Sequence, residues 1–189
     1  LMAIAIVAAL TLFFKVNQVS VSGNERYSAQ EIIEVSGVEQ GDNLILMDKY
    51  RIAEKLYTKL PYITEVRINR QFPDTLLVEV VETKAVAVIK GGSSNWLMDS
   101  NGKLLEVIGS AATKQYLSLE GLSAVDPAIS GKLKLSEESP ISTDRLLELL
   151  SELAQRDMLG KVSKLDASDP DQLVFSYDDR FQVEMLYDA

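Results

Sequence analysis

The stretch from Val66 to Val88 restricts the fold more than any other part of the chain, because two alternating runs flank the turn Gln71-Phe72-Pro73-Asp74. Apolar residues share one side of each run: Val66 and Ile68 in the first, then Leu76, Val78 and Val80 in the second. This pattern predicts a β-hairpin with one buried face. Pro73 lies in the turn, where the N–H that proline lacks is not needed for a hydrogen bond between the strands. The second run continues to Ile89, so we expect one strand to lead from one module into the next.

Two residue types are missing from the chain, and their absence excludes most enzyme classes. The sequence contains no Cys, which excludes disulfides, thiolate nucleophiles and zinc sites built on Cys. It also contains no His, which excludes Ser-His-Asp triads, His-metal sites and imidazole acid–base chemistry. The formal net charge of −9 argues against a nucleic-acid surface, because neutralising phosphates needs clustered Lys and Arg. We therefore expect no catalytic residue, no cofactor and no metal site.

The amino end, from Leu1 to Phe14, carries no charged residue and is closed by Lys15. As a helix it would be about 21 Å long, which is shorter than a hydrocarbon core of about 30 Å. We interpret it as the outer end of a transmembrane helix whose upstream part lies outside the sequence. The anchor residues are then Leu1, Ile4, Ile6, Leu10, Phe13 and Phe14, the last two suiting a membrane–water boundary. The alternative is a buried core helix of a soluble protein.

The segment from Val16 to Glu82 predicts a β-α-α-β-β module. An extended run ends at the turn Ser22-Gly23-Asn24 and is followed by two helices. Ser28 and Asp48 are the expected N-caps of these helices. The apolar stripes of the helices then cover one face of a three-stranded sheet, so the fold class is α+β.

Several motifs in this module resemble the POTRA domain of the DivIB/FtsQ cell-division family. They are VSVSGN at 19–24, LPYI at 60–63, RQFPDTL at 70–76, and VEV at 78–80 with Glu82 before Ala85. The family shows V-x-G-N, L-P-x-V, R-x-x-P-D-T-L and V-x-E-x-P-A patterns in this order, after a single transmembrane helix. Lys84 stands where the proline of the last pattern is usual. The resemblance implies a transmembrane helix end at 1–15, a POTRA domain at 16–83 and a β domain at 84–189.

Residues 84–189 predict a β-rich domain with one long helix. Asn101-Gly102 between two short apolar runs indicates a hairpin, and a W-x-x-D-x-x-G-x-x-L-like hairpin opens the β domain of the family. A calcium loop at Asp99 is disfavoured, because the middle acidic ligand and the bidentate Glu at position 12 are missing. The segments 91–95 and 121–140 are rich in Ser and Gly, and we expect both to be loops.

The carboxyl-terminal part predicts one amphipathic helix and three strands. The helix starts at Ser142, and its leucine stripe fits the covering of a sheet, with a partner-binding helix as the alternative. The strands are expected at Val162–Leu165, Leu173–Tyr177 and Phe181–Leu186. Asp166, Asp169 and Asp171 cluster in one turn. Acidic capping of a solvated turn is the expected role, and a metal site is the alternative.

The family continues past this point with another helix and a closing strand. In the family that region carries the main binding surface for division partners, by adding a strand of the partner to the sheet. Those residues are not in this sequence, which ends at Ala189. If that ending is real, the strand Phe181–Leu186 is left at the sheet edge. We therefore expect partner binding at Phe181, Gln182, Val183, Glu184, Met185 and Leu186.

The resemblance implies a non-enzymatic, membrane-anchored scaffold of the bacterial divisome, with its body outside the cytoplasmic membrane at the division septum. The implied partners are coiled-coil division proteins of the FtsB/DivIC and FtsL types and the septal peptidoglycan synthase complex, which the scaffold helps to regulate. The alternative is a POTRA component of outer-membrane protein assembly or polypeptide secretion, although such proteins usually repeat the module. An enzyme built on paired carboxylates, Glu79 with Glu82 or Glu137 with Glu138, has no supporting motif.

Overall fold

The structure, a computed structural model, describes residues 13–178 and 180–186. The chain divides into two compact units, which meet between Thr83 and Lys84 in the sequence. Each unit has its own hydrophobic core, and we describe each by itself. Within the described ranges, no helix is long and apolar enough to cross a membrane. The predicted anchor residues Leu1, Ile4, Ile6 and Leu10 lie outside the described residues.

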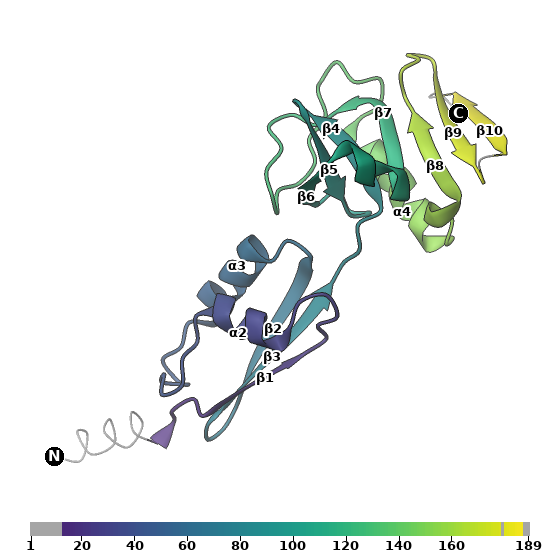
Figure 1. The fold of residues 1–189 in the computed structure, drawn as a ribbon. Coiled ribbons are helices and arrows are strands. Elements are labelled where there is room, and N and C mark those ends of the chain that lie inside the picture. The colour runs from purple at the N-terminus through teal and green to yellow at the C-terminus, as the bar shows by residue number, and fades with distance from the viewer. Residues whose placement is uncertain (1–12, 179, 187–189) are drawn as a thin grey trace. The chain divides into compact units, whose positions relative to one another are not determined.

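The first unit contains a three-stranded sheet with the order β1-β3-β2 (Figure 1). Its strands are β1 (Gln18–Ser22), β2 (Ile63–Gln71) and β3 (Thr75–Glu82). β1 runs parallel to β3, whereas β2 and β3 are antiparallel. The predicted hairpin is confirmed, because Val66 lies opposite Val80 and Ile68 opposite Val78. The alternating apolar residues thus share the buried face, as the period of two requires.

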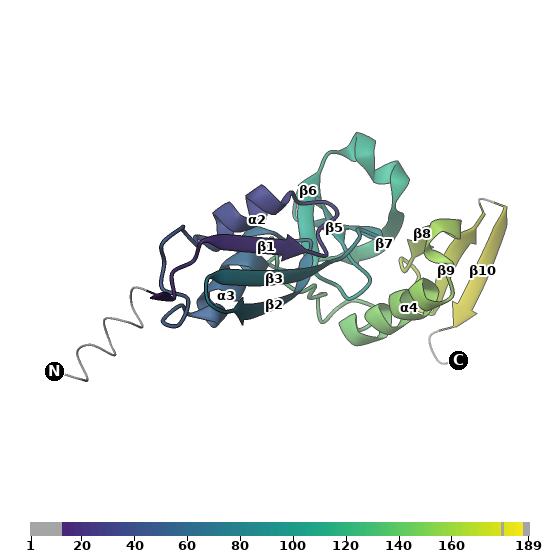
Figure 2. The ribbon, with the colours of Figure 1, turned by 90° about the horizontal axis from the view of Figure 1, so that it is seen from below.

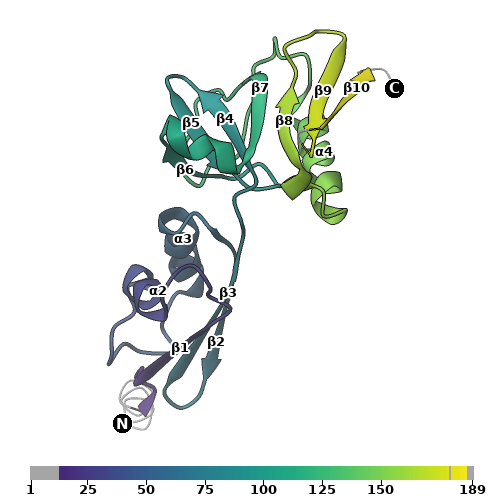
Figure 3. The same cartoon turned by 45° about the vertical axis from the view of Figure 1, so that its right-hand side comes forward.

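Two helices cover one face of this sheet, namely α2 (Ala29–Ser36) and α3 (Lys49–Lys59) (Figure 3). The Ser28 hydroxyl accepts a hydrogen bond from the Glu31 N–H, and the Asp48 carboxylate accepts from the first turn of α3. Both predicted N-caps are therefore confirmed. Gly37 ends α2 in the left-handed conformation, with φ 69°. The core between helices and sheet includes Ile32, Leu44, Leu56, Ile63 and Leu76, each fully buried.

The expectation that one strand passes from the first unit into the second is wrong. β3 ends at Glu82 and β4 begins at Ala87. The Thr83 N–H still donates to the Tyr62 carbonyl of the first unit, whereas the Val86 N–H donates to the Met98 carbonyl of the second. The backbone changes hydrogen-bonding partners between these residues, which interrupts the strand although the sequence stays apolar and extended.

The second unit is built on a seven-stranded sheet with the order β10-β9-β8-β7-β4-β5-β6 (Figure 1). Its strands are β4 (Ala87–Gly91), β5 (Ser94–Met98), β6 (Leu104–Ile108), β7 (Leu117–Ser123), β8 (Val162–Asp166), β9 (Gln172–Tyr177) and β10 (Phe181–Leu186). β7 pairs in parallel with both β4 and β8, and the remaining neighbours are antiparallel. The three predicted carboxyl-terminal strands are confirmed within one residue. The expected loop at 91–95 is shorter, because Gly91 ends β4 and Ser94 begins β5.

One long helix, α4 (Thr143–Gln155), packs on this sheet. The Ser142 hydroxyl caps its first turn by accepting from the Arg145 N–H. Leu146, Leu150 and Leu153 are buried in the core of the unit, so the helix covers the sheet as its leucine stripe predicts. Two short 3-10 helices, Ser110–Gln115 and Leu159–Lys161, connect neighbouring elements and were not predicted.

Candidate functional site

The six residues predicted to bind a partner form β10, which is the last strand at one end of the seven-stranded sheet (Figure 2). β10 pairs with β9 only, with Phe181 opposite Tyr177 and Leu186 opposite Gln172. Successive backbone N–H and C=O groups of a strand point to alternate sides. Half of the polar backbone groups of β10 therefore face away from β9, where the described residues supply no further strand.

The side chains of β10 are largely exposed. Phe181 is 57% exposed, Val183 40% and Leu186 61%. Met185 is the member of the strand that is partly buried, and it packs against the core of the unit. The strand thus presents large apolar side chains at the edge of the described sheet.

The turn between β9 and β10 sets which residues of β10 face the helix. Asp178 adopts a positive φ of 52°, and the Arg180 N–H donates to the Tyr177 carbonyl. Residues that lie opposite each other across two antiparallel strands share one face of the sheet. Val183 lies opposite Phe175 and therefore shares the face on which Phe175 packs against the core. β10 thus extends the apolar face of β9 beyond the part of the sheet that is buried.

A groove of about 270 Å³ runs between α4 and β10. Its apolar lining comes from Ile141, Leu149, Met185 and Leu186. Charged residues of α4 form the rim, where Arg145 and Glu148 approach to 3.7 Å. The leucine stripe of α4 did not predict this groove. The sequence feature that could have predicted the groove is Leu149. It is apolar, it lies in the helix next to the buried Leu150, and it lies outside the buried leucine stripe.

At the opposite end of the sheet, a loop pairs with the first residue of β6. There, the segment from Ser130 to Leu133 lies along the start of β6. The Leu104 N–H donates to the Gly131 carbonyl, and the Ser130 N–H donates back to the Leu104 carbonyl. The side chain of Leu133 is buried in the core of the unit. The prediction of a loop over 121–140 is wrong at its start, because β7 extends to Ser123. Part of the remaining segment, from Ser130 to Leu133, pairs with the start of β6.

Asp99, considered as a calcium ligand, has a structural role instead. Its carboxylate is 1% exposed, and one oxygen accepts the N–H groups of Asn101 and Lys103 at 2.9 Å each. These bonds close the turn between β5 and β6. Burial lowers the pKa of the neighbouring Lys103. The Asp99 carboxylate therefore shapes the turn that the sequence predicted.

The acidic turn after β8 also satisfies its carboxylates internally. Asp166 accepts from the Ser168 N–H, and Asp169 accepts from the Asp171 N–H. Hydrogen bonds from Ser168 and the ammonium of Lys164 lower the pKa of Asp166 to about 2. In the part of the chain that the structure describes, no group of three acidic residues is arranged to hold a metal ion.

The paired carboxylates do not converge. Glu82 uses its carboxylate to accept the backbone N–H groups of Glu25, Arg26 and Tyr27, at 2.6–3.1 Å. Glu79 is exposed and lies opposite Arg67. The role of Glu82 as a cap for the segment after β1 was not predicted, because its partners lie 55–57 residues away in the sequence. Glu137 and Glu138 are exposed in the long loop.

A second hollow, of about 520 Å³, lies on the sheet face that carries Lys90 and Ser118. Its lining contains one acidic residue, Glu120, whose carboxylate lies 2.7 Å from the ammonium of Lys164. This hollow brings together none of the residues predicted as a site.

Comparisons with known proteins agree with the motifs of the first unit. Residues 14–83 match the family model described as "POTRA domain, FtsQ-type". The cell division protein FtsQ of Geotalea daltonii is 32% identical over 155 residues, which cover 79% of this chain and 52% of the relative. The cell division protein DivIB of Clostridium acetobutylicum is 27% identical, with 82% of this chain and 61% of the relative covered. The chain thus spans a little over half the length of these relatives.

Among solved structures, the chain is similar to the major extracytoplasmic domain of the cell division protein DivIB from Geobacillus stearothermophilus. The two share 18% identity with a TM-score of 0.33, over 56% of this chain and 79% of that one. The POTRA match and the sequence relatives carry the assignment. Residues 14–83 are a POTRA domain of the FtsQ type, in a chain that belongs to the DivIB/FtsQ family of cell division proteins.

Proposed function

We propose that the chain is a non-enzymatic, membrane-anchored scaffold of the bacterial division machinery, with its two units on the extracytoplasmic side. It binds coiled-coil division proteins of the FtsB/DivIC and FtsL types, and through them it helps to regulate septal peptidoglycan synthesis. The relatives that carry the name cell division protein support this role. The anchor is the uncharged segment from Leu1 to Phe14, which leads directly into the POTRA domain.

The open edge of β10 is the observation that carries the binding mode. A partner strand that adds to this edge pairs with the outward backbone groups of β10. Its apolar side chains then cover Phe181 and Val183, and residues flanking the strand reach the groove beside α4. Backbone pairing supplies affinity in this arrangement, and the apolar groove supplies specificity.

A pair of proline substitutions tests this mode. Gln182 and Val183 are neighbours on β10, so the N–H of one faces β9 and the N–H of the other faces outward. Proline at the outward position removes a donor and adds a ring that blocks an incoming strand, so we expect partner affinity to fall roughly 10- to 100-fold. Binding of the purified full-length chain in detergent to an FtsB/DivIC-type ectodomain is measured by interferometry.

Gln182→Ala is the matched control, because it removes a side chain and keeps the backbone. Because strand addition uses the backbone, we expect this variant to lose much less affinity than the proline variant at the outward position. Circular dichroism identifies which proline variant keeps the parent fold. If the folded proline variant retains parental affinity, strand addition at β10 is contradicted.

A further inference from the structure

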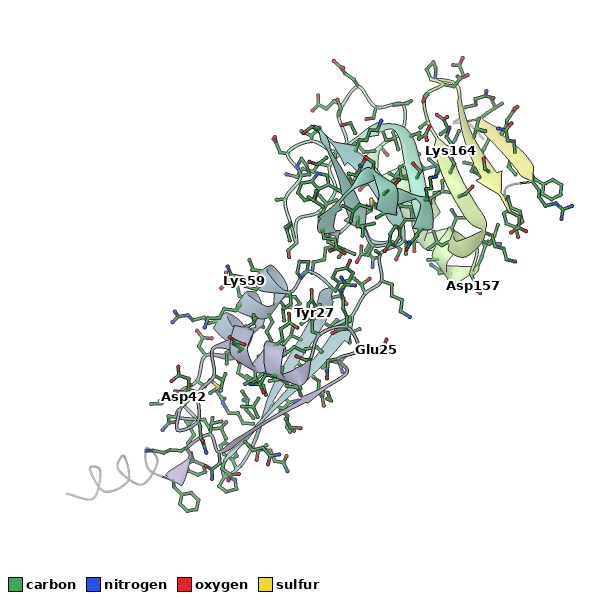
Figure 4. All side chains as sticks on the ribbon, in the orientation of Figure 1. Glu25, Tyr27, Asp42, Lys59, Asp157 and Lys164 are labelled. Atoms are coloured by element: carbon green, nitrogen blue, oxygen red, sulfur yellow. The ribbon has the colours of Figure 1, made fainter. Side chains whose placement is uncertain are left out.

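Three segments of the POTRA unit meet at the end where the chain enters it. The Leu44 N–H donates to the Phe14 carbonyl at 2.8 Å, and the rings of Phe14 and Phe72 lie 5.1 Å apart. The Arg70 guanidinium donates to the Met47 carbonyl at 2.6 Å. Figure 4 shows Asp42 at this end of the unit, and Glu25 and Tyr27 toward the opposite end. The segments that gather here are 13–16, 41–50 and 70–74.

Exposed apolar side chains are concentrated at this end. Within the described part of the first unit, five large apolar residues are strongly exposed. Four of them belong to these three segments, and we call them the apolar tip: Phe13 (68% exposed), Leu46 (76%), Tyr50 (87%) and Phe72 (57%). The fifth is Val81, which lies near the far end of β3. Four of the five strongly exposed large apolar residues described in this unit therefore come from the three segments at this end.

The local structure holds the tip residues outward. The side-chain oxygen of Asn43 accepts the N–H groups of Ile45 and Leu46, which fixes a turn directly after the buried Leu44. Leu44 anchors this turn in the core, so Leu46 projects from it. Phe72 projects in the same way from the turn between β2 and β3. Leu46 and Phe72 are therefore held on turns, whereas Tyr50 lies in the first turn of α3.

We propose that the apolar tip inserts into the interfacial region of a lipid bilayer and seats the POTRA unit on the membrane. The proposal rests on the membrane anchor of the proposed function, because the uncharged segment 1–14 enters the unit at this tip. The tip residues come from three different segments of the unit, and Tyr50 lies in the first turn of α3. Exposed apolar and aromatic side chains beside an uncharged segment are typical of protein parts at the interface of a bilayer.

Charge defines the kind of membrane contact. The chain carries a net charge of −9, so general electrostatic attraction to anionic lipid is unfavourable. The tip segments carry three basic residues and three acidic ones, and so have no net charge: Lys15, Lys49, Arg70, Asp42, Asp48 and Asp74. The long side chains of Lys15 and Lys49 reach headgroup oxygens while their stems stay in the apolar layer. The contact is therefore apolar, and it persists in zwitterionic phosphatidylcholine and at high salt.

The experiment uses the absence of cysteine from the chain. Leu46→Cys and Phe72→Cys each give one site for an environment-sensitive fluorophore, and Val81→Cys is the matched exposed control. The full chain is reconstituted in phosphatidylcholine vesicles, with or without lipid that carries a nitroxide quencher near the headgroup. We expect a blue shift and a loss of roughly half of the fluorescence at 46 and 72, and neither change at 81.

Each result has one meaning. If the labelled chain floats with the vesicles but positions 46 and 72 behave like position 81, the tip does not touch lipid, whereas the anchor holds. A blue shift without nitroxide quenching means that protein covers the tip, either the amino-terminal segment or a second copy, and overturns the proposal. Failure to float overturns both the anchor and the tip contact. Circular dichroism of each variant must match that of the parent chain.

Discussion

The two end strands of the seven-stranded sheet, β6 and β10, differ in their loop contacts and in the exposure of their side chains. At β6, a loop returns from far along the chain and hydrogen-bonds the start of the strand, where Leu104 and Leu105 are each 1% exposed. At β10, the strand has a neighbour on one side, and Phe181 and Leu186 are more than half exposed. Both strands are short and apolar. Within the described residues, what distinguishes them is the loop that pairs with the start of β6, whereas β10 has no such neighbour beyond β9.

The largest expected effect on stability is at the β6 end of the sheet. Leu133 holds the covering loop in the core, so Leu133→Ala should lower the free energy of unfolding by about 2–5 kcal/mol. Ile129, in the same loop, is 54% exposed, and Ile129→Ala should change it by less than about 0.5 kcal/mol. Urea denaturation, followed through a spectroscopic signal from the second unit, measures the free energy of unfolding of both variants. Equal effects of the two substitutions would mean that the loop does not close the edge by packing.

The turn that leads into β6 gives the next effect. Asp99→Ala leaves the N–H groups of Asn101 and Lys103 without their acceptor, so we expect a loss of about 1–3 kcal/mol. Ser100→Ala changes the neighbouring side chain and should be close to neutral. Thermal unfolding compares the two variants. An unaltered midpoint for Asp99→Ala would contradict the role of its carboxylate.

A smaller effect concerns Asp166, on a strand between the two ends. Its pKa is lowered to about 2 in the folded chain, so the stabilisation is present above the unfolded pKa and is lost as pH falls from about 4 toward 2. Because the group is partly exposed, the contribution should be about 1 kcal/mol or less. Asp166→Asn should therefore match the parent near pH 2 and be less stable near pH 6. A difference in stability between the variant and the parent that does not depend on pH would contradict the lowered pKa of Asp166.

The smallest effect on stability is expected at the β10 end of the sheet. Phe181→Ala removes an exposed side chain, so the free energy of unfolding should change by less than about 0.5 kcal/mol. Partner affinity should nevertheless fall, because the ring is covered in the complex. Denaturation and interferometry on the same sample give the two values. A large loss of stability would show that β10 belongs to the core and is not a free surface.

The sequence predicted the local parts of the fold because their determinants are local. Alternation located the hairpin around Pro73 and the strand Phe181–Leu186, and side-chain acceptors located the helix starts after Ser28 and Ser142. In each case the residues that decide the structure lie within a few positions of one another.

The parts that were missed depend on distant partners. No pattern near Glu82 shows that its carboxylate caps the segment at Glu25. The apolar run through Thr83 is extended, and only its hydrogen-bonding partners reveal the break between β3 and β4. The groove beside α4 needs the strand order of the whole sheet, because Leu149 and Met185 meet only once β10 is placed. The partner-binding role of β10 remains a prediction.

The parallel pairing of β1 with β3 has a mechanical consequence. Gln18 lies opposite Thr75, so the start of β1 and the start of β3 are at the same end of the unit, and Glu82 leaves it at the other. Tension applied between Gln18 and Glu82 therefore runs along the strands and loads their hydrogen bonds together in shear, rather than one after another. A domain stretched between a fixed support and a moving assembly resists force best in this geometry.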